Sequence, residues 1–125
     1  MPGITLDAGA LIAAERGDPR IAALIAEANA AGLDIAIPAG VIGQVWRGAP
    51  RQTRVARILR LQIVDEVPLD GVIARAAGVL CGRVGTSDVI DASVALCARD
   101  RGHAVVTSDP DDLARLDPGL RLVAL

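Results

Sequence analysis

Hydrophobic positions along the chain follow two alternating patterns, short apolar runs and longer segments with helical spacing. The short runs, typical of buried strands, lie at residues 3–7, 33–37, 62–65, 104–107 and 120–125. Apolar residues recur with the spacing of one helix face within residues 8–14, 19–31, 38–46, 51–61, 71–82, 88–101 and 111–116. Strands that alternate with helices predict a mainly parallel sheet covered by helices on both faces. We therefore expect an α/β fold.

The length of 125 residues and the hydrophobic content of 52% suit one compact unit with its own core. We therefore predict a single domain over residues 1–125. No apolar run approaches the ~20 residues that a membrane span requires, and the first residues lack the basic segment of a signal peptide. These features predict a cytoplasmic protein that does not associate with membranes. The two cysteines, Cys81 and Cys97, lie in apolar helical patterns and are expected to be buried thiols.

The basic and metal-binding residues exclude several classes of site. All 13 basic residues are arginine, so the chain lacks the lysine of a phosphate-binding P-loop. The absence of lysine also argues against a receiver-type phosphoacceptor domain. With His103 as the only histidine, a structural zinc site and a Ser-His-Asp triad are both disfavoured. The net charge of −2 gives no overall attraction to nucleic acid, so any such binding would need a local patch.

Four aspartates fall where a parallel sheet places its functional crevice. Asp7 ends the first strand, Asp109 follows strand 104–107, and Asp88 and Asp91 begin the helix that leads into that strand. Because the crevice lies outside the carboxyl ends of the strands, we expect these acids at one edge of the sheet. Converging carboxylates repel each other unless a divalent cation binds them. Oxygen ligands suit Mg²⁺ or Mn²⁺, and the chemistry indicated is metal-assisted hydrolysis of a phosphodiester.

Each acid also has a structural interpretation. Asp88 is equally well explained as the N-cap of its helix, and Asp109 as the cap of the turn that follows it. Asp91 is less easily explained as a capping residue, and Asp7, which closes a buried strand, needs a partner or an ion. The neighbouring acids Asp111 and Asp112 are most simply first-turn helix residues.

A row of arginines offers a second candidate surface. Its members have no acid between them and occupy positions 47, 51, 54, 57 and 60. Such a row suits either contacts with a phosphate backbone or a protein interface. Trp46, the only aromatic residue, precedes the row, and a tryptophan is more often found in a core or an interface than as a platform for a nucleobase.

Several short motifs occur in a characteristic order. They are Leu6-Asp7-Ala8-Gly9-Ala10-Leu11-Ile12-Ala13, then Pro38 followed by Gln44-Val45-Trp46-Arg47-Gly48, then Asp88 with Asp91-Ala92, and finally Thr107-Ser108-Asp109. In this order and spacing the chain resembles the PIN-domain ribonucleases, and specifically the VapC toxins of bacterial VapBC toxin–antitoxin pairs. The resemblance covers the whole chain.

The resemblance implies a three-layer α/β/α sandwich and an endoribonuclease that uses Mg²⁺ or Mn²⁺. It also implies a homodimer and neutralisation by a cognate VapB-type antitoxin. The first acid of the family matches Asp7, the third Asp91 with Asp88 as an accessory position, and the fourth Asp109. The second acid, usually glutamate, falls on Gln44, which keeps a carbonyl oxygen but loses a charge.

The substitution at Gln44 leaves three functions to weigh. The first is an endoribonuclease toxin in which Gln44 binds a metal-bound water or substrate, with Thr107 or Ser108 orienting ligands. The second is a catalytically weak or silent PIN-like domain that binds RNA or a partner. The third is a phosphatase or nucleotide hydrolase of another α/β class. Such enzymes are expected to have an Asp-x-Asp after the first strand and a lysine, and this chain has neither. Glu15 could replace the missing acid, but it lies two turns, about 11 Å, beyond Asp7.

Overall fold

The computed structural model describes residues 2–125, in which five parallel strands form one sheet. The strands are β1 (Gly3–Leu6), β2 (Asp34–Pro38), β3 (Val64–Val67), β4 (Ala104–Thr107) and β5 (Leu122–Ala124). Their order in the sheet is β3-β2-β1-β4-β5, so the first strand of the chain is the central one. In register, Ile4 pairs with Ile35 on one side and with Ala104 on the other.

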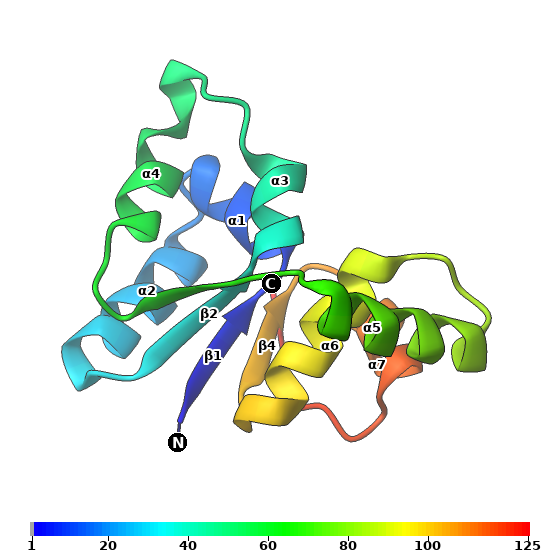
Figure 1. The fold of residues 1–125 in the computed structure, drawn as a ribbon. Helices are drawn as coiled ribbons and strands as arrows, with labels where there is room; N and C mark the ends of the chain where they lie inside the picture. The colour runs from blue at the N-terminus through cyan, green and yellow to red at the C-terminus, as the bar shows by residue number, and fades with distance from the viewer. Residues whose placement is uncertain (1) are drawn as a thin grey trace.

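Helices cover both faces of this sheet, as the sequence predicts. They are α1 (Ala8–Glu15), α2 (Pro19–Ala31), α3 (Ala39–Val45), α4 (Thr53–Leu59), α5 (Gly71–Val84), α6 (Val89–Arg101) and α7 (Pro110–Leu116), with a 3₁₀ turn η1 (Pro50–Gln52). Helices α1, α2 and α4 lie on one side of the sheet, and α5, α6 and α7 lie on the other (Figure 1). The α/β/α fold class is therefore confirmed.

Several element boundaries differ from the predicted ones, and three of the differences have a clear local cause. Pro38 ends β2 instead of opening the next helix, because its carbonyl and fixed φ still suit the strand that pairs with Val67. The segment 51–61 divides into η1 and a shorter α4. The third strand begins at Val64 instead of Gln62, because the Val64 N–H bonds back to the Leu61 carbonyl in a turn.

Small residues in α1 and α3 permit the close packing that shapes the carboxyl edge of the sheet. A Cβ atom at Gly9 would clash with the Ser108 side chain, and one at Gly40 would clash with Ile90. The two glycines therefore bring α1 against the loop after β4, and α3 against the first turn of α6. Substitution of either glycine would displace segments that carry candidate site residues.

The core is aliphatic, and α6 lies at its centre. Residues Ala92–Ala98 of α6 are all buried, whereas Asp91 at its first turn is only half-buried. Both cysteines are buried free thiols, as predicted. Within residues 2–125, no helix is long and apolar enough to cross a bilayer.

Candidate active site

Asp7 lies at the carboxyl end of the central strand and caps the helix that follows. Its side chain is 6% exposed, and its Oδ1 accepts the Ala10 N–H at 2.9 Å. Burial raises the pKa of Asp7, while hydrogen bonds from the Thr107 hydroxyl and from the N–H groups of Ala10 and Gly9 lower it in part. The buried acid thus has partners, but they do not cancel the cost of keeping it ionised.

Asp88 and Asp91 form a second part of the same edge. Asp88 is the N-cap of α6, with its Oδ1 accepting the Asp91 N–H at 2.9 Å. The reciprocal bond of a capping box is absent from the described residues, because the Asp88 N–H is bonded to the Thr86 hydroxyl at 3.2 Å. The Asp91 carboxyl thus does not close a capping box, and it lies against the Asp88 carboxyl instead.

Among the acids at this edge, Asp91 has the least favourable environment for a negative charge. Its pKa is raised to about 6, first by burial and then by the neighbouring carboxylates Asp88, Asp7 and Asp112. The effect of Asp7 on this pKa shows that the acid after β1 and the acid of α6 lie close enough to repel each other. The structure thus brings together Asp7, from the start of the chain, and Asp91, from its last third.

Asp109 follows β4 and is paired with a residue that the sequence analysis assigned only to a helix turn. Hydrogen bonding with the Asp112 carboxyl is the largest cause of the raised pKa of Asp109. Although Asp109 is the N-cap residue of α7, its side chain makes no cap hydrogen bond. Its N–H is instead bonded to Thr107 Oγ1 at 2.8 Å. Thr107 therefore contacts both Asp7 and Asp109.

A small concavity of about 140 Å³ gathers three of these acids, Asp88, Asp91 and Asp112, beside Arg115. Asp112 is the residue that sequence reasoning missed. Its signal was its position three residues after Asp109, which places both side chains on one side of the first helical turn. Either acid could have been read as a favourable charge at a helix start, so the pattern alone did not separate the two roles.

The acids suit a hydrated cation better than one fully enclosed by protein. Among residues 2–125, no three His, Cys, Asp or Glu side chains lie close enough to hold an ion between them. Mg²⁺ and Mn²⁺ need no such cage, since such ions are often bound through one or two carboxylates and keep several waters. A divalent charge beside Asp91 would also relieve the repulsion that raises its pKa.

The two residues considered for the missing acid have different positions. Gln44 is exposed on α3, one turn beyond Gly40 and therefore on the side of the helix that faces Ile90. Glu15, at the end of α1, accepts a hydrogen bond from Gln52 at 2.8 Å and lies 3.6 Å from Arg51. Glu15 is thus engaged away from the acidic edge, as its distance along α1 suggested. The acidic edge is the carboxyl edge of the sheet with Asp7, Asp88, Asp91, Asp109 and Asp112.

The arginine row divides into parts with different neighbours. Arg54 Nη1 donates to the Glu15 carbonyl at 3.2 Å, at the end of α1. Arg54 and Arg57 border an apolar groove of about 380 Å³ between α2 and α4, floored by Ile25, Ile58 and Leu61 among others. Arg47 instead lies beside Trp46, whose carbonyl accepts from Arg47 Nη1 at 2.8 Å, and Arg51 lies 3.6 Å from Glu15.

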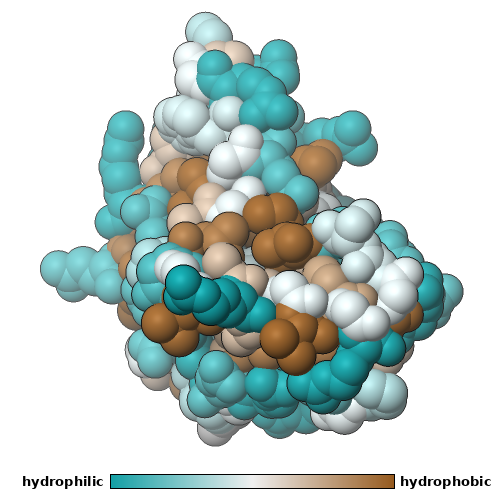
Figure 2. Space-filling view, turned by 45° about the vertical axis from the view of Figure 1, so that its right-hand side comes forward, coloured by the Kyte–Doolittle hydropathy of each residue, from teal (hydrophilic) through white to brown (hydrophobic). Residues whose placement is uncertain are grey.

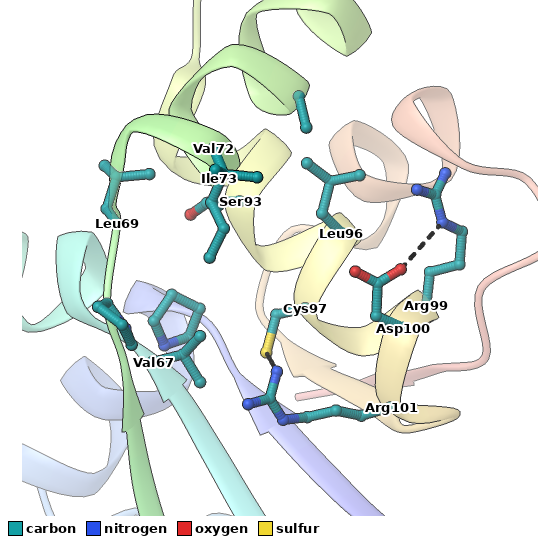
Figure 3. Close-up of a pocket in the computed structure, with 13 residues that line it drawn as sticks. Val67, Leu69, Val72, Ile73, Ser93, Leu96, Cys97, Arg99, Asp100 and Arg101 are labelled. Carbon is teal, nitrogen blue, oxygen red and sulfur yellow. Dashed lines mark hydrogen bonds and ion pairs between the residues drawn. The ribbon is translucent and has the colours of Figure 1, made fainter.

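A further apolar surface lies on the opposite side of the sheet, between α5 and α6. Figure 2, in which this side is turned forward, shows hydrophobic side chains gathered in the middle of the face. Val72 is 74% exposed, and with Leu69 and Leu96 it lines a groove of about 160 Å³. Figure 3 shows the Arg99–Asp100 ion pair beside this groove, with a separation of 3.7 Å.

Comparison with known proteins agrees with this architecture. The sequence model of the PIN domain matches residues 4–118. No curated protein sequence matches the chain. Among solved structures, this chain is similar to VapBC2 from Rickettsia felis, whose structure was determined with a bound DNA fragment from the VapBC2 promoter. The two chains superpose with a TM-score of 0.70 at 15% identity, with 98% of each chain covered.

Two further structures share the fold at similarly low identity. FitAB bound to an IR36 DNA fragment has a TM-score of 0.62 at 14% identity, covering 97% of this chain and 94% of that chain. FitAcB from Neisseria gonorrhoeae has a TM-score of 0.60 at 16% identity, with 95% of each chain covered. The matched residues include the whole acidic edge, from Asp7 to Asp112. The chain therefore belongs to the PIN domain family.

Proposed function

We propose that this PIN domain is a metal-dependent endoribonuclease and the toxin of a type II toxin–antitoxin pair. The observation that carries the proposal is Asp91, whose pKa is raised to about 6 by burial and by three further carboxylates at the carboxyl edge of the sheet. PIN domains are typically nucleases that use divalent metals. The structures with the same fold come from toxin–antitoxin complexes.

Each residue has a role in this proposal. Asp7, Asp91 and Asp109 would hold Mg²⁺ or Mn²⁺, directly or through water, with Asp88 and Asp112 in support. Such an ion would lower the pKa of a water and stabilise charge on the phosphate under attack. The Thr107 hydroxyl orients Asp7, to which it is hydrogen bonded. The Gln44 amide, on the side of α3 facing the start of α6, would bind a water of the ion or the RNA.

The test is Mn²⁺-dependent cleavage of single-stranded RNA by purified protein free of antitoxin. Asp7→Asn and Asp91→Asn are each expected to reduce cleavage by more than about 100-fold, because each removes a carboxylate from the ion. Asp34→Asn, a matched change of an exposed acid at the start of β2, should leave the rate unaltered. Full activity of Asp7→Asn would refute the assignment.

The alternative is a catalytically silent PIN domain that binds RNA or a partner. The observation in its favour is that Gln44 stands where the family has a glutamate, which removes one negative charge from the cation site. RNA binding without metal-dependent cleavage would identify this alternative.

The proposed protein partners are a cognate VapB-type antitoxin and a second copy of the chain. The groove between α2 and α4 combines an apolar floor with Arg54 and Arg57, and so suits an amphipathic antitoxin helix that carries acidic residues. The groove between α5 and α6 carries Val72 beside the Arg99–Asp100 pair. Since it offers both charge signs around an apolar centre, this surface can complement itself across a two-fold axis.

A further inference from the structure

Trp46 is exposed although it is the only aromatic residue of the chain. It follows α3 as its C-cap residue, and it is 41% exposed while the core is filled by aliphatic side chains. A tryptophan offers a large flat surface that gains free energy when it is covered. The question is therefore which molecule covers it.

The turn that carries Trp46 is held by hydrogen bonds to the side chain of Gln52, a buried residue that is 1% exposed. Gln52 Nε2 donates to Glu15 Oε1 at 2.8 Å and to the Val45 carbonyl at 2.7 Å. Its Oε1 accepts the N–H groups of Arg47 at 2.8 Å and Gly48 at 3.1 Å. All four hydrogen-bonding positions of the amide are thus used to hold the two ends of this turn against α1.

The conformation of the turn also keeps space beside the indole. Gly48 has φ +69°, a conformation that L side chains rarely adopt, and a Cβ atom there would lie 4.0 Å from Trp46 Nε1. The indole is therefore presented on a preformed turn that does not need to be ordered when a ligand binds.

The segment that carries Trp46, residues 44–54, contains three arginines and no acid. Arg47 Nη1 donates to the carbonyls of Gly43 at 3.2 Å and Trp46 at 2.8 Å, which holds the guanidinium beside the turn. Arg51 is 67% exposed, and its ion-pair contact is the 3.6 Å one with Glu15. A second copy related by a two-fold axis would bring these like charges together, so the surface favours an anionic ligand.

The turn is also connected to the acidic edge by a single helix. Helix α3 leaves the carboxyl edge of the sheet and leads up to the hydrophilic tip that η1 forms at the top of the molecule (Figures 1 and 2). The seven residues of α3 span about 10 Å. An RNA strand with one phosphate at the acidic edge can therefore extend along α3, the helix that carries Gln44, and reach Trp46.

We propose that Trp46 is a stacking platform for an unpaired base of the RNA substrate, with Arg47 and Arg51 contacting the adjoining phosphates. The inference rests on the proposed ribonuclease function and names a residue of its substrate-binding surface. Stacking on an aromatic ring is open to every base, because every base has a π-face. Trp46 therefore selects for unpaired nucleotides and not for a sequence.

The test uses the fluorescence of Trp46, which no other tryptophan or tyrosine obscures. The whole protein is titrated with an eight-nucleotide oligouridylate in EDTA, where metal-dependent cleavage cannot occur. We expect saturable quenching of the emission. Trp46→Ala should weaken binding by about 5- to 150-fold, measured by anisotropy of end-labelled RNA, because stacking contributes about 1–3 kcal/mol per base. Trp46→Phe should restore most of the affinity.

Several outcomes would overturn the inference. One is saturable RNA binding by anisotropy with no change in Trp46 emission, or with equal affinity in Trp46→Ala. Equal quenching by an oligomer of abasic nucleotides or by polyglutamate would show a response to charge alone. Emission that changes with protein concentration before RNA is added would assign Trp46 to a contact between copies.

The proposed catalytic function can fail separately. Quenching in EDTA without any cleavage in Mn²⁺ would leave the stacking role intact and remove the nuclease assignment. If the native protein cleaves RNA and the Trp46→Ala variant binds and cleaves it equally well, the nuclease assignment stands and the stacking role is removed.

Discussion

At the scale of single residues, two aspartates combine a structural and a proposed chemical role. Asp7 and Asp88 each accept a backbone N–H at a helix start, at 2.9 Å, and each also lies at the acidic edge. From the sequence alone, capping and ligation are alternatives for Asp88. In the structure each cap hydrogen bond is accepted by one carboxylate oxygen, Oδ1, so capping does not by itself exclude ligation by the same side chain.

The raised pKa of Asp91 predicts how stability depends on pH without metal. Its folded-state pKa, about 6, lies above the ordinary 3.8, so the folded protein binds this proton more tightly than the unfolded chain. The resulting stability is present below about pH 4 and is lost as pH rises through about 6. In EDTA, Tm should fall between pH 4.5 and 7, and Asp91→Asn should flatten the profile. An unchanged profile in that variant would contradict the pKa assignment.

Gln44→Glu predicts the opposite change in charge. Restoring the carboxylate should tighten Mn²⁺ binding by about tenfold or more, because each added ligand charge strengthens the attraction for the cation. Calorimetric titration of the native chain, Gln44→Glu and Asp7→Asn measures the effect. Equal Mn²⁺ affinity in the native and Gln44→Glu proteins would place residue 44 outside the site.

At the scale of elements, the Gln52 amide joins α1, α3 and η1. Gln52→Ala should lower the free energy of unfolding by about 1–3 kcal/mol, because it leaves buried partners such as the Val45 carbonyl without a hydrogen bond. Urea unfolding measures the change, and Gln62→Ala, at an exposed position, should alter stability by less than about 0.5 kcal/mol. Similar stability losses in both variants would mean that the hydrogen bonds of Gln52 do not account for the loss in Gln52→Ala.

The sequence predicted the element types well, since apolar spacing and helix caps are local signals. The alternation of strands and helices was enough to place Asp7, Asp91 and Asp109 at one edge. Local signals could not reveal Gln52, because its partners, including Glu15, are brought to it by tertiary packing. The role of Asp112 was hidden for a similar reason, since its neighbour Asp91 belongs to another helix.

At the scale of the whole molecule, the two apolar grooves lie on opposite sides of the sheet and should act independently. Ala22→Glu places an acid in the α2–α4 groove and should abolish copurification with the cognate antitoxin while leaving self-association intact. Val72→Glu should do the reverse, giving a monomer in sedimentation that still binds antitoxin. Each variant is the control for the other, and loss of both properties in either one would contradict separate surfaces.

The central position of β1 has a consequence for synthesis on the ribosome. β1 is made long before β4, but its pairing with β4 joins Ile4 to Ala104, so one side of β1 remains an open edge until residues 104–107 have been made. Pairing between such distant segments is slow to form, and an open strand edge invites aggregation. The same pairing joins Asp7 to the residues after β4. A nascent or truncated chain therefore lacks the complete acidic edge, and the proposed activity can appear only after β4 and the residues that follow it, through Asp112, have been made.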